Sequence, residues 1–175
     1  MMNKLKINKS KKSGFSLLEV LIAIVVFSFG LLGIAGLMTV SIRSNHNGYL
    51  RSQATILGNN MSARMRANVA GLWAGNYNGV ASSTVTDICT SGTPCTREVL
   101  ATYDMEHWGQ LLDQLLPSGT GEITCPVVAL PVGILSDGLW IASPPFPETC
   151  IIDISWNESN ETGSSAQTLQ LVIQP

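Results

Sequence analysis

An uncharged stretch of 23 residues constrains what this chain can fold into more than any other feature. No Asp, Glu, Lys or Arg lies between Glu19 and Arg43, and most of the residues there are apolar. An α-helix needs about 20 apolar residues to cross the hydrocarbon core of a bilayer, so this stretch is long enough to span a membrane. Hydrophobic residues make up 45% of all 175, which excludes a wholly disordered chain.

Charged residues on either side predict the orientation of such a helix. Of the twelve acidic residues only Glu19 precedes residue 87, whereas all five lysines lie in the first twelve residues, at Lys4, Lys6, Lys9, Lys11 and Lys12. Basic residues favour the cytoplasmic side of a membrane. We therefore expect the N-terminus in the cytoplasm and the chain after Arg43 on the far side.

Two ordinary explanations of the apolar stretch fit poorly. A cleaved secretory signal peptide has a shorter apolar run followed by a small-x-small site, and only S-I-R and S-N-H follow here, at residues 41–46. A plain signal anchor gains nothing from Glu19, because a carboxylate within hydrocarbon costs a few kcal/mol.

Cleavage between Gly14 and Phe15 would explain Glu19. The new amino group on Phe15 would be positive near neutral pH, since its reference pKa is about 7.7–8.0. Glu19 lies four residues further on, on the same face of a helix. The amine and the carboxylate could then neutralise each other, within one chain or between neighbouring chains.

The run KKSGFSLLEV at residues 11–20 resembles the class III signal of type IV pilins and type II secretion pseudopilins. That signal consists of a basic leader, Gly, Phe, Ser or Thr, Leu-Leu or Leu-Ile, Glu and a long apolar run. The resemblance implies that a prepilin peptidase cuts after Gly14 and methylates the new N-terminus at Phe15. It also implies that Glu19 is the acid that pairs during filament assembly. The chain would then be a substrate of the peptidase and not an enzyme.

A second apolar pattern extends the helix. A stripe with spacings of 4, 3, 4 and 4 follows the uncharged stretch, as expected of an amphipathic helix: Leu50, Ala54, Leu57, Met61 and Met65. No proline occurs from Phe15 to Gly71. We predict one helix from about Phe15 to about Ala70, roughly 80 Å long. Gly30, Gly33 and Gly36 within it fit either close helix packing in lipid or a segment that can unwind.

The remaining chain predicts a small α+β body. Residues 75–96 are rich in Gly, Ser, Thr and Asn, which predicts a loop. Residues 103–116 predict a short helix with Asp104 as its cap, and a strand begins at Glu122. Alternating apolar residues at 150–156 and 167–173 predict a hairpin, with residues 157–166 as its exposed polar linker.

These features narrow the resemblance to PilV-type minor pilins, the type IV pilus modification proteins. The resemblance rests first on the N-terminal run FSLLEVLIAIVVFSFGLLGIAGL. It rests also on LPSGTGEI at residues 116–123, which follows Asp104, Trp108 and Leu112 and precedes Cys125. The third match is I-S-W at residues 154–156. It implies a pilin fold, in which a long N-terminal helix packs on a small antiparallel β-sheet. The expected divisions are a leader peptide at 1–14, a transmembrane or filament-core half-helix at 15–43, an amphipathic half-helix at 44–74 and a globular domain at 75–175.

Four cysteines lie in the part expected outside the cytoplasm: Cys89, Cys95, Cys125 and Cys150. An oxidising periplasm favours disulfides, and four cysteines allow three connectivities. We prefer Cys89–Cys95 with Cys125–Cys150. A zinc site is the alternative, although no C-x2-C pair is present.

Other chemistry is not indicated. No common catalytic or nucleotide-binding motif occurs, His46 and His107 stand apart, and Asp104 and Glu106 point to different helix faces. We expect no cofactor and no metal. Without residues 1–14 the chain has 5 Arg and 12 acids, a side-chain charge of −7, which disfavours nucleic acid as a partner. Four arginines on the helix do not share one face and are assigned solvated or interface roles: Arg43, Arg51, Arg64 and Arg66.

The sequence thus predicts a minor pilin that takes part in initiating assembly of a type IV pilus and is incorporated into it. A minor pseudopilin of a type II secretion system is the alternative, and a signal-anchored periplasmic binding module or enzyme is a distant third. Expected partners are the prepilin peptidase, other minor and major pilins, the inner-membrane assembly platform and membrane lipid. The expected location is the bacterial inner membrane, followed by the pilus at the cell surface.

Overall fold

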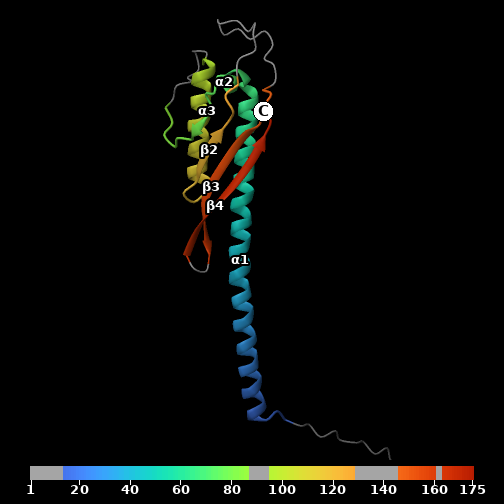
Figure 1. Ribbon diagram of the computed structural model, residues 1–175. Helices are drawn as coiled ribbons and strands as arrows, with labels where there is room; N and C mark the ends of the chain where they lie inside the picture. The colour runs from blue at the N-terminus through green and yellow to red at the C-terminus, as the bar shows by residue number, and fades with distance from the viewer. Residues whose placement is uncertain (1–13, 87–94, 129–145, 161–162) are drawn as a thin grey trace, which may run out of the picture. The chain divides into compact units, whose positions relative to one another are not determined.

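The computed structural model describes residues 14–86, 95–128, 146–160 and 163–175 (Figure 1). It forms two compact units, one up to Ile42 and one from Arg43 onward. The helices and strands, in chain order, are α1 (Leu17–Ala67), α2 (Val69–Trp73), β1 (Gly79–Val80), α3 (Arg97–Leu115), β2 (Thr120–Thr124), β3 (Cys150–Asn160) and β4 (Gly163–Ile173). A long N-terminal helix packed on a small antiparallel sheet confirms the predicted α+β pilin-like arrangement.

Helix α1 is continuous over 51 residues, including the segment with Gly30, Gly33 and Gly36. Residues 17–42 are exposed all around the helix. Burial starts at Leu50, and the predicted apolar stripe is confirmed because all five of its members are buried: Leu50, Ala54, Leu57, Met61 and Met65.

The predicted end of this helix, near Ala70, is wrong. Helix α1 stops at Ala67, and Asn68 adopts a non-helical conformation with φ −119° and ψ 57°. Its side-chain oxygen accepts a hydrogen bond from the amide of Gly71 (3.1 Å), and its side-chain nitrogen donates one to the carbonyl of Arg97 (2.8 Å). Asn68 therefore caps the short helix α2, and this contact to a distant segment could not be read from local periodicity.

The four strands form one antiparallel sheet in the order β1-β2-β3-β4. One face of the sheet is apolar, because Ile123 of β2 lies opposite Ile152 of β3, which lies opposite Leu171 of β4. Ile123 and Ile152 are buried in the same core cluster as the stripe of α1. The opposite face is largely polar, as expected of an antiparallel sheet with one solvated side.

Gly58 allows α1 to approach this sheet closely. A Cβ atom at that position would collide with the side chain of Leu171 on β4 and crowd Ile154 on β3. The same turn of α1 also binds α3, because the indole nitrogen of Trp108 donates a hydrogen bond to the carbonyl of Leu57 (3.1 Å). Both α3 and the sheet are thus fixed to one short segment of α1.

The hairpin is longer than predicted, and its expected linker at 157–166 is wrong. Strands β3 and β4 stay paired as far as Asn160 and Gly163, with Asn157 opposite Ala166. The backbone pairing extends the ladder there although these polar residues do not continue the apolar alternation. The predicted loop at 75–96 likewise contains β1, whose two residues pair with β2.

Helix α3 begins at Arg97 rather than at residue 103, and Thr96 is its cap. The Thr96 hydroxyl accepts a hydrogen bond from the amide of Val99 (3.3 Å). On α3 Trp108 and Leu112 are buried, as is Leu116 directly after it, whereas Leu115 is 41% exposed.

Asp104, predicted as a helix cap, is instead buried in the middle of α3. One carboxylate oxygen pairs with a guanidinium nitrogen of Arg64 on α1 (2.8 Å), and the other accepts a hydrogen bond from the hydroxyl of Tyr77 (2.8 Å). Burial, and then the bond to Asp104, raises the pKa of Tyr77 above its ordinary value, so Tyr77 remains a donor. Arg64, expected at a solvated or interface position, thus binds Asp104.

We predict that Asp104→Ala lowers the free energy of unfolding by about 2–4 kcal/mol, because it leaves Arg64 and the buried Tyr77 hydroxyl without their shared acceptor. Equilibrium urea unfolding of the detergent-solubilised chain, followed by tryptophan fluorescence, measures the change. Glu106→Ala is the matched control, since Glu106 lies on the same helix but binds Thr86 at the surface (2.7 Å). Its cost should stay under about 1 kcal/mol, and equal losses in the two variants would contradict the role of Asp104.

Candidate processing and assembly site

Gly14, Phe15 and Ser16 precede α1 as an exposed, non-helical segment. The Phe15 side chain is 86% exposed. Apart from its chain neighbours, no described residue has an atom within 4 Å of a Cβ placed on Gly14. The peptide bond between Gly14 and Phe15 therefore lies in an exposed, non-helical segment that a peptidase can reach.

The first turn of α1 is organised around Ser16 and Glu19. The carbonyl of Ser16 accepts hydrogen bonds from the amides of Glu19 (3.0 Å) and Val20 (3.2 Å). The helix thus begins at Leu17, two residues after the predicted start. Ser followed three residues later by Glu is the spacing of a capping box, a local signal for the helix start that the sequence reasoning missed.

Phe15 and Glu19 line one shallow groove on the surface of α1, together with Val20, Ala23, Ile24 and Phe27. Apart from Glu19 these residues are apolar. Glu19, Ala23 and Phe27 are spaced four residues apart along one face of α1, and Phe15, just before the helix, lines the same groove. The amino group that cleavage would create at Phe15 would therefore begin on the groove that holds the Glu19 carboxylate.

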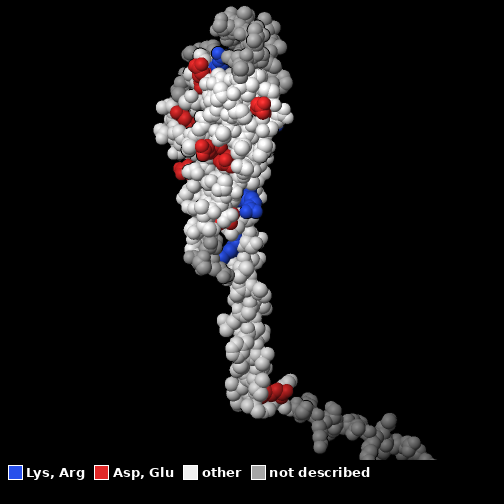
Figure 2. All heavy atoms as spheres, viewed as in Figure 1, with Lys and Arg blue, Asp and Glu red and all other residues white. Residues whose placement is uncertain are grey.

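The rest of the N-terminal part of α1, up to Ile42, is largely apolar and is not covered by other parts of the described chain. Among the described residues, α1 is the one helix that is long and apolar enough to cross a membrane, and its most apolar window is not buried. Figure 2 shows α1 as an uncharged surface between the acidic group at its start and the first basic groups further along. The exposed apolar side chains include Leu21, Phe29, Leu32 and Leu37. Water is a poor solvent for such a surface, so this half of α1 requires lipid or other apolar helices.

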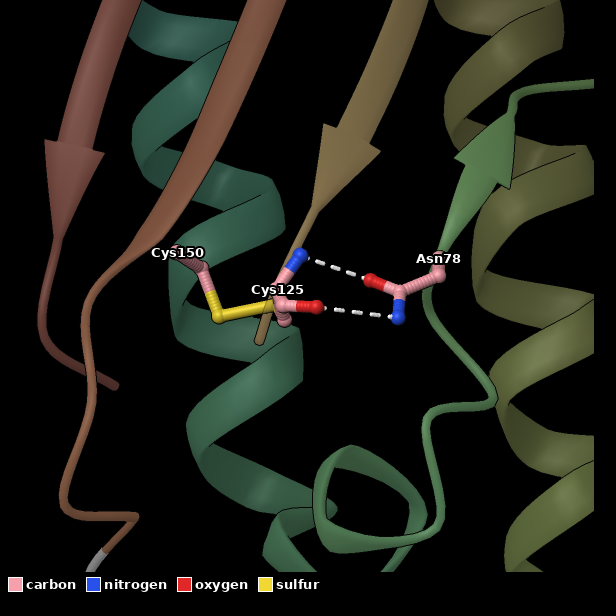
Figure 3. Close-up of a disulfide and its surroundings, with 3 residues drawn as sticks. All are labelled: Asn78, Cys125 and Cys150. Atoms are coloured by element: carbon pink, nitrogen blue, oxygen red, sulfur yellow. Dashed lines mark hydrogen bonds between the residues drawn. A yellow bond between two sulfur atoms is a disulfide. The ribbon is translucent and has the colours of Figure 1, made fainter. Parts of the chain in front are cut away.

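Two of the four cysteines form a disulfide that the structure describes, between Cys125 after β2 and Cys150 at the start of β3 (Figure 3). Next to the disulfide, the side chain of Asn78 pairs with the backbone of Cys125. Its nitrogen donates to the carbonyl of Cys125 (3.1 Å), and its oxygen accepts from the Cys125 amide (2.7 Å). Cys95 is also disulfide-bonded, and Cys89 lies outside the described residues.

The structure brings together few of the other polar residues considered from the sequence. His46 is exposed, and His107 stacks near Tyr103, with 5.9 Å between ring centroids. Asp104 and Glu106 bind different partners, as described above. Within the described ranges no three His, Cys, Asp or Glu side chains are placed to hold a metal ion.

Residues 9–35 match the family model of the prokaryotic N-terminal methylation motif. This motif is typical of type IV pilins and pseudopilins, and it indicates a pilin-like or pseudopilin protein with a structural role. It implies processing by a prepilin peptidase and assembly with other pilins, and together with the apolar helix it is consistent with membrane anchoring. No curated protein and no solved structure matches the chain.

We predict that replacing Cys125 and Cys150 together by Ser lowers the free energy of unfolding by about 2–4 kcal/mol, because the disulfide restricts the unfolded chain. Thermal unfolding without reductant measures the change. Asn78→Ala is a useful comparison, since it removes two hydrogen bonds beside an intact disulfide and should cost about 1–2 kcal/mol. A non-reduced peptide map that lacks the linked Cys125 and Cys150 peptides would contradict this pairing.

Proposed function

We propose that the chain is a minor pilin of the PilV type, which takes part in initiating assembly of a type IV pilus and is incorporated into it. The observation that carries the proposal is the run G-F-S-L-L-E at residues 14–19, placed at the start of an exposed apolar helix that continues into an α+β body. The motif provides a processing signal, the helix a membrane anchor and filament core, and the body a surface for other subunits.

Gly14 supports cleavage at this point because the chain itself has no need of a glycine there. A side chain at Gly14 would meet no atom of the described residues, so packing within those residues does not call for a glycine there. The requirement for a small residue then comes from a partner that closes around the backbone. A peptidase that cuts between Gly14 and Phe15 and methylates the Phe15 amino group is such a partner.

Glu19 supports filament assembly through the energetics of a charge in an apolar surface. It is the one acid on α1, and it lies beside Phe15 in a groove that is otherwise apolar. Transfer of this groove into lipid or against other helices costs a few kcal/mol unless the carboxylate has a partner. The N-terminal amine of Phe15, in the same chain or in a neighbouring subunit, is the cation that cleavage supplies.

The proposed location follows from the charges around the apolar stretch. The five lysines keep the leader in the cytoplasm, and the body lies in the periplasm, where the Cys125–Cys150 disulfide is stable. The subunit first lies in the inner membrane and then in the pilus at the cell surface. Its partners are the prepilin peptidase, minor and major pilins, the inner-membrane assembly platform and membrane lipid.

A minor pseudopilin of a type II secretion system is the second candidate, because the same motif is typical of pseudopilins. Deletion of the gene separates the two functions. Loss of piliation with normal secretion supports the pilus, and loss of secretion with normal piliation supports the secretion system. A signal-anchored enzyme or binding module predicts neither phenotype.

We predict that the intact mass of the protein from its native host lacks residues 1–14 and carries one additional methyl group on Phe15. Both changes should disappear in a strain without the prepilin peptidase, because that enzyme performs both reactions. Tandem mass spectrometry of the N-terminal peptide locates the methyl group. A full-length, unmethylated chain in both strains would rule out the pilin and the pseudopilin alike.

We predict that Glu19→Gln leaves cleavage after Gly14 unchanged but lowers incorporation into sheared filaments about tenfold or more, because the amide keeps the shape and loses the charge. Immunoblots of the membrane and filament fractions measure both effects. Glu122→Gln, which neutralises an exposed acid on β2, is the control and should assemble normally. Normal incorporation of Glu19→Gln would remove Glu19 from the assembly mechanism.

A further inference from the structure

A short segment of α1 just past the apolar stretch combines positive charge with an exposed aromatic ring. Arg43 follows the last apolar residues directly, and Arg51 lies eight residues later. Both are exposed, and Tyr49 between them is 54% exposed. We call Arg43, Tyr49 and Arg51 the juxtamembrane collar. Figure 2 shows basic groups on α1 where its uncharged stretch ends.

Among the described residues, neither arginine of the collar forms an ion pair. No Asp or Glu lies in the sequence between Glu19 and Asp87, so α1 itself offers these two arginines no carboxylate within several helical turns. The ion pair that the described part of the chain forms joins Arg64 to Asp104 instead. The collar therefore presents two guanidinium groups to an external anion.

Geometry places these groups at the level of lipid headgroups when the apolar stretch spans a bilayer. With about 1.5 Å per residue, the 23 uncharged residues cover roughly the 30 Å hydrocarbon core, and Arg43 lies at its edge. Arg51 lies about 12 Å further along the axis. Helical side chains tilt toward the N-terminus, so the long side chain of Arg51 extends back toward the membrane surface.

We propose that the juxtamembrane collar binds anionic phospholipid headgroups on the outer, periplasmic surface of the inner membrane. Guanidinium groups form paired hydrogen bonds with phosphate, and a tyrosine at this depth suits the interface between hydrocarbon and water. The inference rests on the proposed function for the side of the membrane that the collar faces. Lipid binding fixes the depth of α1 before assembly and is broken when the subunit moves into the filament.

The test uses the full-length chain in detergent, with equal amounts of phosphatidylglycerol and phosphatidylcholine. Native mass spectrometry counts how many lipids of each type the protein retains. The wild type should retain phosphatidylglycerol preferentially. In the double variant Arg43→Gln and Arg51→Gln, the ratio of retained phosphatidylglycerol to phosphatidylcholine should fall about fivefold for each arginine replaced. The five leader lysines also attract anionic lipid, but their contribution is the same in every variant.

The matched control is the double variant Arg66→Gln and Arg97→Gln, which removes the same charge further from the apolar stretch. It should keep the wild-type preference. Unchanged lipid preference in the collar variant overturns the proposal, and so does an equal loss in both double variants, because net charge alone would then explain the binding. A third result would also overturn the proposal. If a carboxylate of a neighbouring subunit cross-links near Arg43 in a membrane-free filament, and the collar variant keeps its lipid preference, the collar makes protein contacts instead.

Processing is measured on the same variants by intact mass, so the two proposals fail separately. If a collar variant is cut after Gly14 and keeps its lipid preference, the lipid-binding proposal fails and the pilin proposal stands. A chain that is never cut, yet loses lipid preference when the collar is replaced, removes the pilin proposal and leaves the collar as a lipid-binding site.

Discussion

The body of this protein depends on the burial of one stripe of α1 against the apolar face of the sheet. Gly58 lets Leu171 and Ile154 come close to the helix backbone, and the carbonyl of Leu57 in the adjacent position accepts the indole hydrogen bond of Trp108. A close-packed contact of this kind tolerates little change in volume. Two successive residues of α1 therefore set the positions of β3, β4 and α3.

The same helix meets two different environments along its length. From Leu50 onward its apolar stripe is buried by the chain itself, although Ile56 off the stripe stays exposed, and up to Ile42 its apolar residues are all exposed. The free energy gained by removing apolar surface from water is the same in both parts, but in the first part only lipid or other helices can supply the cover. The change occurs within about two turns, where Arg43, Tyr49 and Arg51 lie exposed. These three residues therefore lie between the part of α1 that needs lipid or other helices and the part that the body covers, which suits a role at the membrane interface.

The sequence predicts the parts of this fold that arise from local periodicity, and it fails where distant segments decide. The stripe from Leu50 to Met65 and the core strands around Ile152 repeat with the helix and strand periods, so their burial follows from the pattern alone. Asn68 ends α1 because it bonds to the carbonyl of Arg97, which is 29 residues away. Asp104 looked like a cap because acids favour helix starts, but Arg64 and Tyr77 bind it in the core. No pattern of neighbours contains that information.

The candidate site is predictable for the opposite reason, since its signal lies within six consecutive residues. Its energetics also link cleavage to assembly. The dipole of α1 favours Glu19 in the first turn by about 0.3–1 kcal/mol at an exposed position, whereas a carboxylate in hydrocarbon costs about 2.5–3.5 kcal/mol even on mild insertion scales. The helix dipole alone does not offset that cost, so Glu19 needs a cation at the same depth. The leader lysines lie on the far side of Gly14, and the proposed cleavage would remove them and create an amine on Phe15, at the groove that Glu19 lines. A chain that keeps its leader would hold Glu19 next to the lysines at the cytoplasmic surface of the membrane, and only the cut chain would carry its own counter-charge into an apolar filament.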